Sequence, residues 1–279
     1  MIGAAIGLAS TMFASSLAQE NDAESKNAES KKKKSDTFKV LRLAADTCEI
    51  KQDKEKVERI EAPIYRYSDP ARSHDGTIWA WGKKGRPLAL LTIAEDDDDN
   101  RLVTEGILLS DKPLTVEYGT GGQKRARASD RDSIFSKRLL PIDSAPQPAK
   151  SKVQLQSQAK SLARQFDAFE IWNNDNKTEE RRYQLRLLPK PIHRYSDKEA
   201  GILDGSIFLF NYGSDPELAM VIEASKSGWK AGFIRLGHAK ATVEVNGKTF
   251  YSHPWFSGRD PHYLFTHLQK PSITTAEAN

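Results

Sequence analysis

The sequence predicts an α+β protein, mostly antiparallel β, made of two tandem homologous units, each a helix followed by a β-meander. A heptapeptide occurs twice, as PIYRYSD at residues 63–69 and as PIHRYSD at residues 191–197. Each copy leads through an Asp-Gly pair into a segment rich in aromatic and β-branched residues. A stretch in which apolar residues recur at helical spacing precedes each heptapeptide. Repetition of this kind predicts a duplicated structural unit.

The match between the copies extends beyond the heptapeptide. It pairs residues 48–50 with 169–171, 75–81 with 204–210, 88–91 with 218–221, and 115–118 with 242–245. The chain has 279 residues, of which 38% are hydrophobic and 29% are charged. That length and composition suit two small hydrophobic cores, and we expect one core in each copy.

These matches, and the composition of the segments between them, divide the chain into six parts. The parts are a signal peptide (1–18), a disordered, polar and lysine-rich tether (19–36), repeat unit 1 (37–135), a proline-rich linker (136–150), repeat unit 2 (151–256), and a C-terminal strap and tail (257–279).

Helical spacing precedes both meanders. In the second copy, apolar residues recur at intervals of three and four, which predicts a helix with one apolar stripe. The stripe consists of Leu155, Ala159, Leu162, Ala163 and Phe166. The first copy has a shorter pattern of the same kind, with its N-cap at residues 35–37 and its stripe ending at Ala45.

The period of the pattern then drops to two, as expected of strands with one buried face. Residues 183–187 alternate in this way. The pairs Asp75-Gly76 and Asp204-Gly205 are predicted to form turns that launch the next strand. The pair Asn246-Gly247 predicts a two-residue hairpin turn with positive φ at both positions.

The N-terminus predicts export to the periplasm or the extracellular space. Residues 2–18 are uncharged and end in small residues that suit a signal peptidase, so we expect cleavage before Gln19. A retained anchor is the alternative, although 17 apolar residues are marginal for a membrane span and no stable span is expected. The tether that follows has too few apolar residues to order itself.

The expected partner is an anionic cell-surface or extracellular polymer. The run Lys31–Lys34 could bind an anionic surface, although a run this short is more often simply solvated. The net charge is only +4, and no motif resembles a nucleic-acid module. We therefore expect no nucleic-acid partner.

The repeated charged residues are the first candidates for a binding site. Arg66 and Asp69 lie three apart in the first copy, as do Arg194 and Asp197 in the second, so each pair could form a charge-assisted hydrogen bond. The alternative is architectural: the aspartate organises a turn and the arginine clamps a neighbouring strand. Retention of the motif in both copies favours this alternative.

No catalytic residue, metal site or cofactor is predicted. His253, His262 and His267 lack the spacing of a zinc site on a regular element, and surface or partly packed positions are expected for them. Cys48 is the sole cysteine, so it forms no intramolecular disulfide, and we expect it to pack in the core.

The residues suggest a family. The runs YQLRLLPKPIHRYSD, LDGSIFLFNYGSDPELAMVIEA and ATVEVNGKTFYSHP together resemble a group of exported proteins of planctomycete bacteria that have no known activity. The resemblance covers most of the second copy and, more weakly, the first. It implies an exported bacterial protein and assigns no reaction.

Two functional hypotheses follow. The favoured one is a non-enzymatic binding or scaffold protein that contacts its partner through exposed aromatic residues such as Trp79, Trp81 or Trp255. The alternative is a hydrolase that acts on an extracellular polymer, with paired carboxylates in a cleft between the two units.

Overall fold

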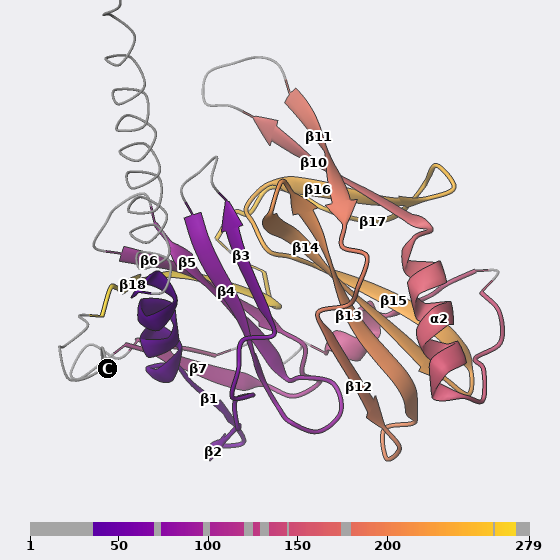
Figure 1. Ribbon diagram of the computed structural model, residues 1–279, viewed down its shortest axis with the longest axis horizontal. Coiled ribbons are helices and arrows are strands. Elements are labelled where there is room, and N and C mark those ends of the chain that lie inside the picture. Colours follow the sequence, from indigo (N-terminus) through magenta and orange to yellow (C-terminus); the bar gives the residue numbers. More distant parts are fainter. Residues whose placement is uncertain are drawn as a thin grey trace, which may run out of the picture.

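The computed structural model describes residues 36–69, 74–96, 101–119, 125–128, 134–143, 145–173, 180–258 and 260–271. Within them the protein is mostly antiparallel β with two helices, which confirms this part of the predicted fold class (Figure 1). The predicted signal peptide and nearly all of the tether lie outside the described residues. No described helix is long and apolar enough to cross a membrane.

The first half begins with a helix over residues 36–46. Its strands are β1 (Glu49–Gln52), β2 (Glu55–Lys56), β3 (Tyr65–Asp69), β4 (His74–Trp81), β5 (Ala89–Glu95), β6 (Arg101–Leu108), β7 (Leu114–Tyr118) and β8 (Arg125–Ala128). Strands β3 to β6 form an antiparallel meander, and β1, β2, β7 and β8 form a separate small sheet.

The segment between the halves carries a 3-10 helix η2 (Phe135–Arg138) and β9 (Leu140–Pro141), and the second half begins with the helix α2 (Lys152–Ala163). Its other strands are β10 (Phe166–Asn173), β11 (Glu180–Leu187), β12 (His193–Asp197), β13 (Ile202–Tyr212), β14 (Asp215–Ser225), β15 (Gly228–Arg235), β16 (Lys240–Val245), β17 (Lys248–His253) and β18 (Tyr263–Gln269). Strands β12 to β15 form a second meander, which continues through β11 into β10, β16 and β17.

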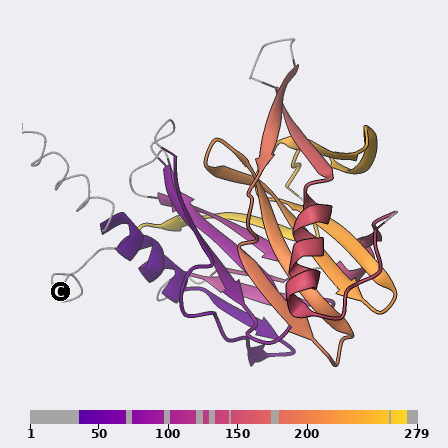
Figure 2. The same ribbon diagram turned by 45° about the vertical axis from the view of Figure 1, so that its right-hand side comes forward.

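The two meanders pack against each other, and each is covered on its outer side by a helix (Figures 1 and 2). The core between them takes side chains from both, for example Ile78 and Ala80 from β4 and Ile207 and Leu209 from β13. Helix α2 contacts β13 and β14 on the outer side of the second meander. The chain thus has one core per half and a third core that joins them.

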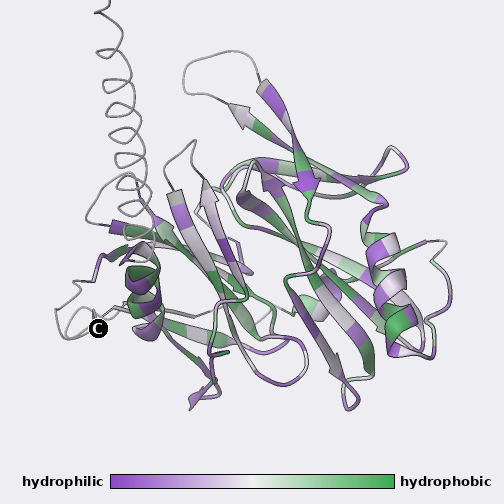
Figure 3. Cartoon of the chain, in the orientation of Figure 1, coloured by the Kyte–Doolittle hydropathy of each residue, from purple (hydrophilic) through white to green (hydrophobic). Residues whose placement is uncertain are grey.

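Burial on both faces explains why the central strands are almost continuously apolar (Figure 3). In β4, Ile78 and Ala80 face the joining core, while Trp79 and Trp81 face the core under the first helix. Trp79 is 1% exposed and Trp81 is 2% exposed. The expectation that these two tryptophans are exposed is therefore wrong, because β4 has no solvent-facing side.

The repeated tyrosine and glycine face each other in both meanders. Tyr67 is paired with Gly76 across β3 and β4, and Tyr195 is paired with Gly205 across β12 and β13. A Cβ atom on either glycine would lie 2.2 Å from a carbon of the tyrosine ring. Both glycines lie within strands, so the predicted turns at the Asp-Gly pairs are wrong. Only glycine fits at these two positions, because the tyrosine ring occupies the space that any larger residue would need for its side chain.

The predicted hairpin between β16 and β17 is confirmed. Asn246 and Gly247 have φ angles of 51° and 72°, and Val245 is paired with Lys248 across the turn. Positive φ at both positions is the geometry of a two-residue turn that follows the twist of its strands.

The sheet of each half takes in one strand from a segment outside that half. The C-terminal strand β18 pairs antiparallel with β6 and becomes the fifth strand of the first sheet. In the linker that follows the first half, β9 pairs with β15 of the second meander. The predicted C-terminal strap is therefore a sheet strand in residues 263–269, and part of the linker is tied to the second half. We call this arrangement the strand exchange.

A buried carboxyl group lies at the β18–β6 contact and makes stability depend on pH. Tyr263 donates to Glu105 Oε1 at 2.5 Å, and burial raises the pKa of Glu105 from 4.5 to about 8. Between pH 4.5 and about 8, the Glu105 carboxyl group is ionised in the unfolded chain but still protonated in the folded chain. The free energy of unfolding should therefore fall as pH rises through this window, by a few kcal/mol on the order-of-magnitude scale of such linkage.

Glu105→Gln should flatten this dependence, since a glutamine amide can accept the hydrogen bond from Tyr263 without ionising. Urea unfolding at pH 5, 6.5 and 8 measures the effect, with Glu199→Gln, at an exposed position, as the control. Equal slopes with pH for Glu105→Gln and the wild type would contradict the assignment.

Candidate functional site

Two grooves occupy corresponding places in the two halves. Each lies between the helix of its half and the strand that carries the repeated arginine. The first groove has a volume of about 210 Å³ and the second about 860 Å³. Only the second falls in the range of about 300–1,000 Å³ that is common for small-molecule sites.

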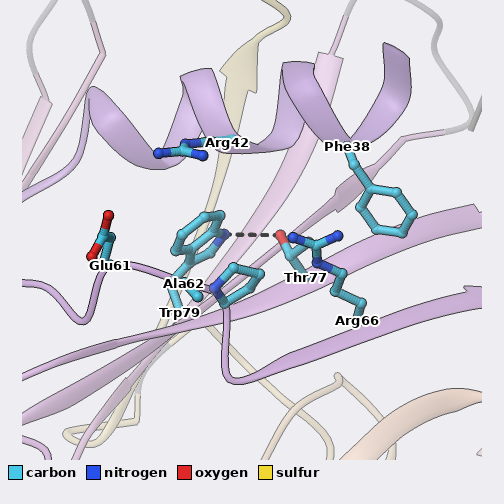
Figure 4. A pocket seen from close by; sticks show the side chains of 8 residues that line it. Phe38, Arg42, Glu61, Ala62, Arg66, Thr77 and Trp79 are labelled. Atoms are coloured by element: carbon cyan, nitrogen blue, oxygen red, sulfur yellow. Dashed lines mark hydrogen bonds between the residues drawn. The ribbon is translucent and has the colours of Figure 1, made fainter. Parts of the chain in front are cut away.

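In the first groove, side chains from the helix and from the sheet lie close together (Figure 4). The Arg66 guanidinium lies over the Phe38 ring, 5.1 Å from its centroid, and Arg42 projects from the same helix as Phe38. Trp79 Nε1 donates to Thr77 Oγ1 at 2.9 Å at the base of the groove. The repeated arginine of the first half is thus packed against an aromatic ring.

In the second groove, the repeated arginine makes an ion pair. Arg194 Nη2 lies 2.5 and 2.6 Å from the two carboxylate oxygens of Asp204, whose side chain is only 5% exposed. Burial raises the pKa of Asp204, and Arg194 opposes that shift. The pair joins β12 to β13 and places the guanidinium at the wall of the groove.

The expected pairing of Arg194 with Asp197 is wrong, because Arg194 contacts Asp204 on the next strand instead. Asp197 Oδ1 accepts hydrogen bonds from the backbone N–H groups of Glu199 and Ala200 at 3.0 and 3.1 Å. This geometry agrees with the alternative interpretation for the second copy: the aspartate organises a turn and the arginine clamps a strand. The side chain of Asp69 lies outside the described residues.

Arg194→Met should lower the free energy of unfolding by about 2 kcal/mol, because it leaves the buried Asp204 carboxylate without its cation. Asp197→Ala should cost only about 1 kcal/mol, as it removes two turn hydrogen bonds at a partly exposed position. Urea unfolding measures both losses. The double variant Arg194→Met/Asp204→Asn should recover part of the first loss, and a double variant as unstable as the sum of its single changes would contradict the pairing.

Three lysines complete the second groove. Lys150 comes from the linker, Lys152 from the start of α2, and Lys226 from the turn between β14 and β15. Sequence reasoning missed all three, because they are far apart in the chain and belong to no motif. The only signal was the repeated arginine, which marked the wall of the groove.

The remaining predicted site residues are distributed elsewhere. Trp255 is partly exposed and packs edge-to-face against Trp172, with ring centroids 5.7 Å apart. His253 and His262 are buried rather than at the surface, with 6% and 4% of their surface exposed. In the described part of the chain, no three histidine, cysteine or acidic side chains are grouped so that they could hold a metal ion.

Cys48 packs in the core of the first half, as predicted. Its thiol lies 3.4 Å from the carbonyl oxygen of Ala44, and burial raises its pKa to about 12. The thiol is therefore protonated at neutral pH, and its position suits packing rather than nucleophilic chemistry.

The structure defines a mostly antiparallel β protein with a cationic groove beside the helix of its second half. No protein-family model, curated protein sequence or solved structure matches the chain.

Proposed function

We propose that this chain is an exported, non-enzymatic binding protein built from two duplicated units, like the exported planctomycete proteins that it resembles. The observation that carries the binding role is the contrast between the grooves. One of two corresponding grooves is small and narrowed by Phe38, while the other has about four times its volume and a cationic lining. A duplicated fold in which one copy has an open groove suits a ligand-binding role.

The strand pairings support the duplication. Ile50 pairs with Val116 across β1 and β7, and Ala168 pairs with Val243 across β10 and β16, next to the helix of each half. An offset of 118 also aligns the buried residues at the ends of the two helices. These residues are Leu41, Ala44, Ala45 and Cys48 in the first half and Ala159, Leu162, Ala163 and Phe166 in the second. In this register the counterpart of Cys48 is Phe166, and not Phe169, which the sequence match of residues 48–50 with 169–171 pairs with it.

The repeated polar residues support a binding role over catalysis. Arg194, Asp197 and Tyr195 each make contacts that hold β12 in place. Between the two meanders, where the hydrolase alternative places its site, the described residues form an apolar cluster, and the buried carboxyl groups Glu105 and Glu223 are held there by Tyr263 and by Arg86. We therefore retain the binding protein as the proposal.

The test asks whether the protein binds an immobilised polymer without cleaving it. The purified chain is incubated with immobilised polygalacturonate, a carboxylate polymer, and with neutral dextran, while the release of new reducing ends is followed. The proposal expects retention on the acidic polymer and no release above that of a heat-denatured sample. Release that depends on the folded chain would overturn the non-enzymatic assignment, and no retention on either polymer would overturn the binding role.

A further inference from the structure

The second groove carries an excess of positive charge. Arg194, Lys150, Lys152 and Lys226 line it, and Asp204 is its only acidic lining residue. Since Asp204 is already paired with Arg194, the excess resides on the lysines. Among the described residues, none of the three ammonium groups forms an ion pair, and Lys152 acts on the Asp204 carboxylate only at longer range. A groove with three such cations on three different elements is electrostatically complementary to an anion.

We infer that the second groove binds a short stretch of an acidic polysaccharide, whose carboxylate or sulfate groups pair with Lys150, Lys152 and Lys226. This inference rests on the proposed binding function and names its site and ligand chemistry. The attraction between a carboxylate and an ammonium group in contact grows as water is excluded from the groove. Three such contacts along one groove give useful affinity without any one of them being strong.

The apolar part of the lining favours a sugar polymer over a small inorganic anion. Leu203 is 42% exposed at the groove, while Leu155 and Tyr195, which also line it, are mostly buried. A sugar ring has apolar C–H faces between its polar groups, so it can cover the Leu203 side chain while its acidic group reaches a lysine. A groove of about 860 Å³ also exceeds what a single phosphate or sulfate would fill.

The first groove is not expected to bind the same ligand. Its charged lining includes Glu61 as well as Arg42 and Arg66, and its volume is about 210 Å³. One binding site per chain is therefore expected, although the protein has two similar halves.

Charge reversal in the groove tests the inference. The purified full chain and the variant Lys152→Glu/Lys226→Glu are titrated with short oligomers of polygalacturonate by calorimetry at 0.15 M and 1 M salt. The matched control is Lys137→Glu/Lys248→Glu, which changes the net charge equally at exposed lysines outside the groove. We expect a stoichiometry of one, an affinity about tenfold or more lower for the groove variant, and weaker binding at high salt.

The outcomes separate the inference from the proposed function. Unchanged affinity of the groove variant, or an equal loss in the control, would overturn the groove assignment while the binding function stands. Absence of binding to any polymer by the wild type would overturn both. Tighter binding of single-stranded DNA of matched charge would overturn the polysaccharide assignment. Circular dichroism of both variants checks that each is folded, which is expected because the four substituted lysines are exposed.

Discussion

Gly205→Ala is expected to lower the free energy of unfolding by about 3 kcal/mol or more, because it inserts a methyl group where the Tyr195 ring lies. The new Cβ would be 2.2 Å from Cε2 of that ring, a distance that requires the ring or the strand to move. The ring is held at its far end, since Tyr195 donates to Glu223 at 2.7 Å and Glu223 in turn contacts Arg86. Equilibrium unfolding in urea measures the loss.

Gly213→Ala is the control for the general effect of adding a side chain. Gly213 has a φ of +62°, and no atom lies within 4 Å of the place that a Cβ would take, so only backbone strain of about 1 kcal/mol is expected. The double variant Tyr195→Ala/Gly205→Ala should be little less stable than Tyr195→Ala alone, because the clash is gone. Additive losses in this cycle would show that the ring is not what requires glycine.

Replacement of Arg86 by methionine is expected to cost about 3–5 kcal/mol, because it leaves the buried Glu223 carboxylate without its cation. Arg86 belongs to the first half and Glu223 to the second, and their side chains are 13% and 10% exposed. Arg86 Nε lies 3.1 Å from Glu223 Oε1. Burial raises the pKa of Glu223, and Arg86 opposes that shift. Without Arg86 the carboxyl group is more readily protonated as the pH falls, so the loss of stability should be smaller at pH 5 than at pH 8.

An exposed ion pair made by a lysine of the same loop as Arg86 provides the control. Lys83 and Glu58 have side chains that are 56% and 73% exposed, so Lys83→Met should cost less than about 1 kcal/mol. The double variant Arg86→Met/Glu223→Gln should recover much of the stability that Arg86→Met loses. Equal losses for Arg86→Met and Lys83→Met would mean that the ion pair between the halves contributes little to the fold.

Local pattern was sufficient to predict part of the secondary structure, but not how the sheets meet. The stripe of α2 and the turn at Asn246-Gly247 depend on nearby residues, and the structure agrees with both, except that Phe166 of the predicted stripe begins β10. The burial of Trp79 and Trp81 depends on a second sheet and a helix that cover both faces of β4, which periodicity cannot reveal. The pairing of β18 with β6 joins residues about 160 positions apart and leaves no local pattern.

The candidate site was predictable to a smaller extent. Repetition drew attention to Arg194, and the structure places it at the wall of the second groove. Its partner, Asp204, lies ten residues away on the next strand and was predicted only as part of a turn. Lys150, Lys152 and Lys226 meet only because the linker, α2 and a hairpin turn converge in space. Convergence of this kind is a property of the tertiary structure.

The strand exchange has a consequence for how this protein is made. The sheet of the first half lacks its fifth strand until residue 269 has been synthesised, near the end of the 279-residue chain. The first half alone therefore cannot complete its sheet, and a cut or a frameshift that removes residues 263–269 would damage the part of the chain that was made first. If the chain is exported as proposed, the same dependence delays completion of the fold while the N-terminus is being delivered to the membrane.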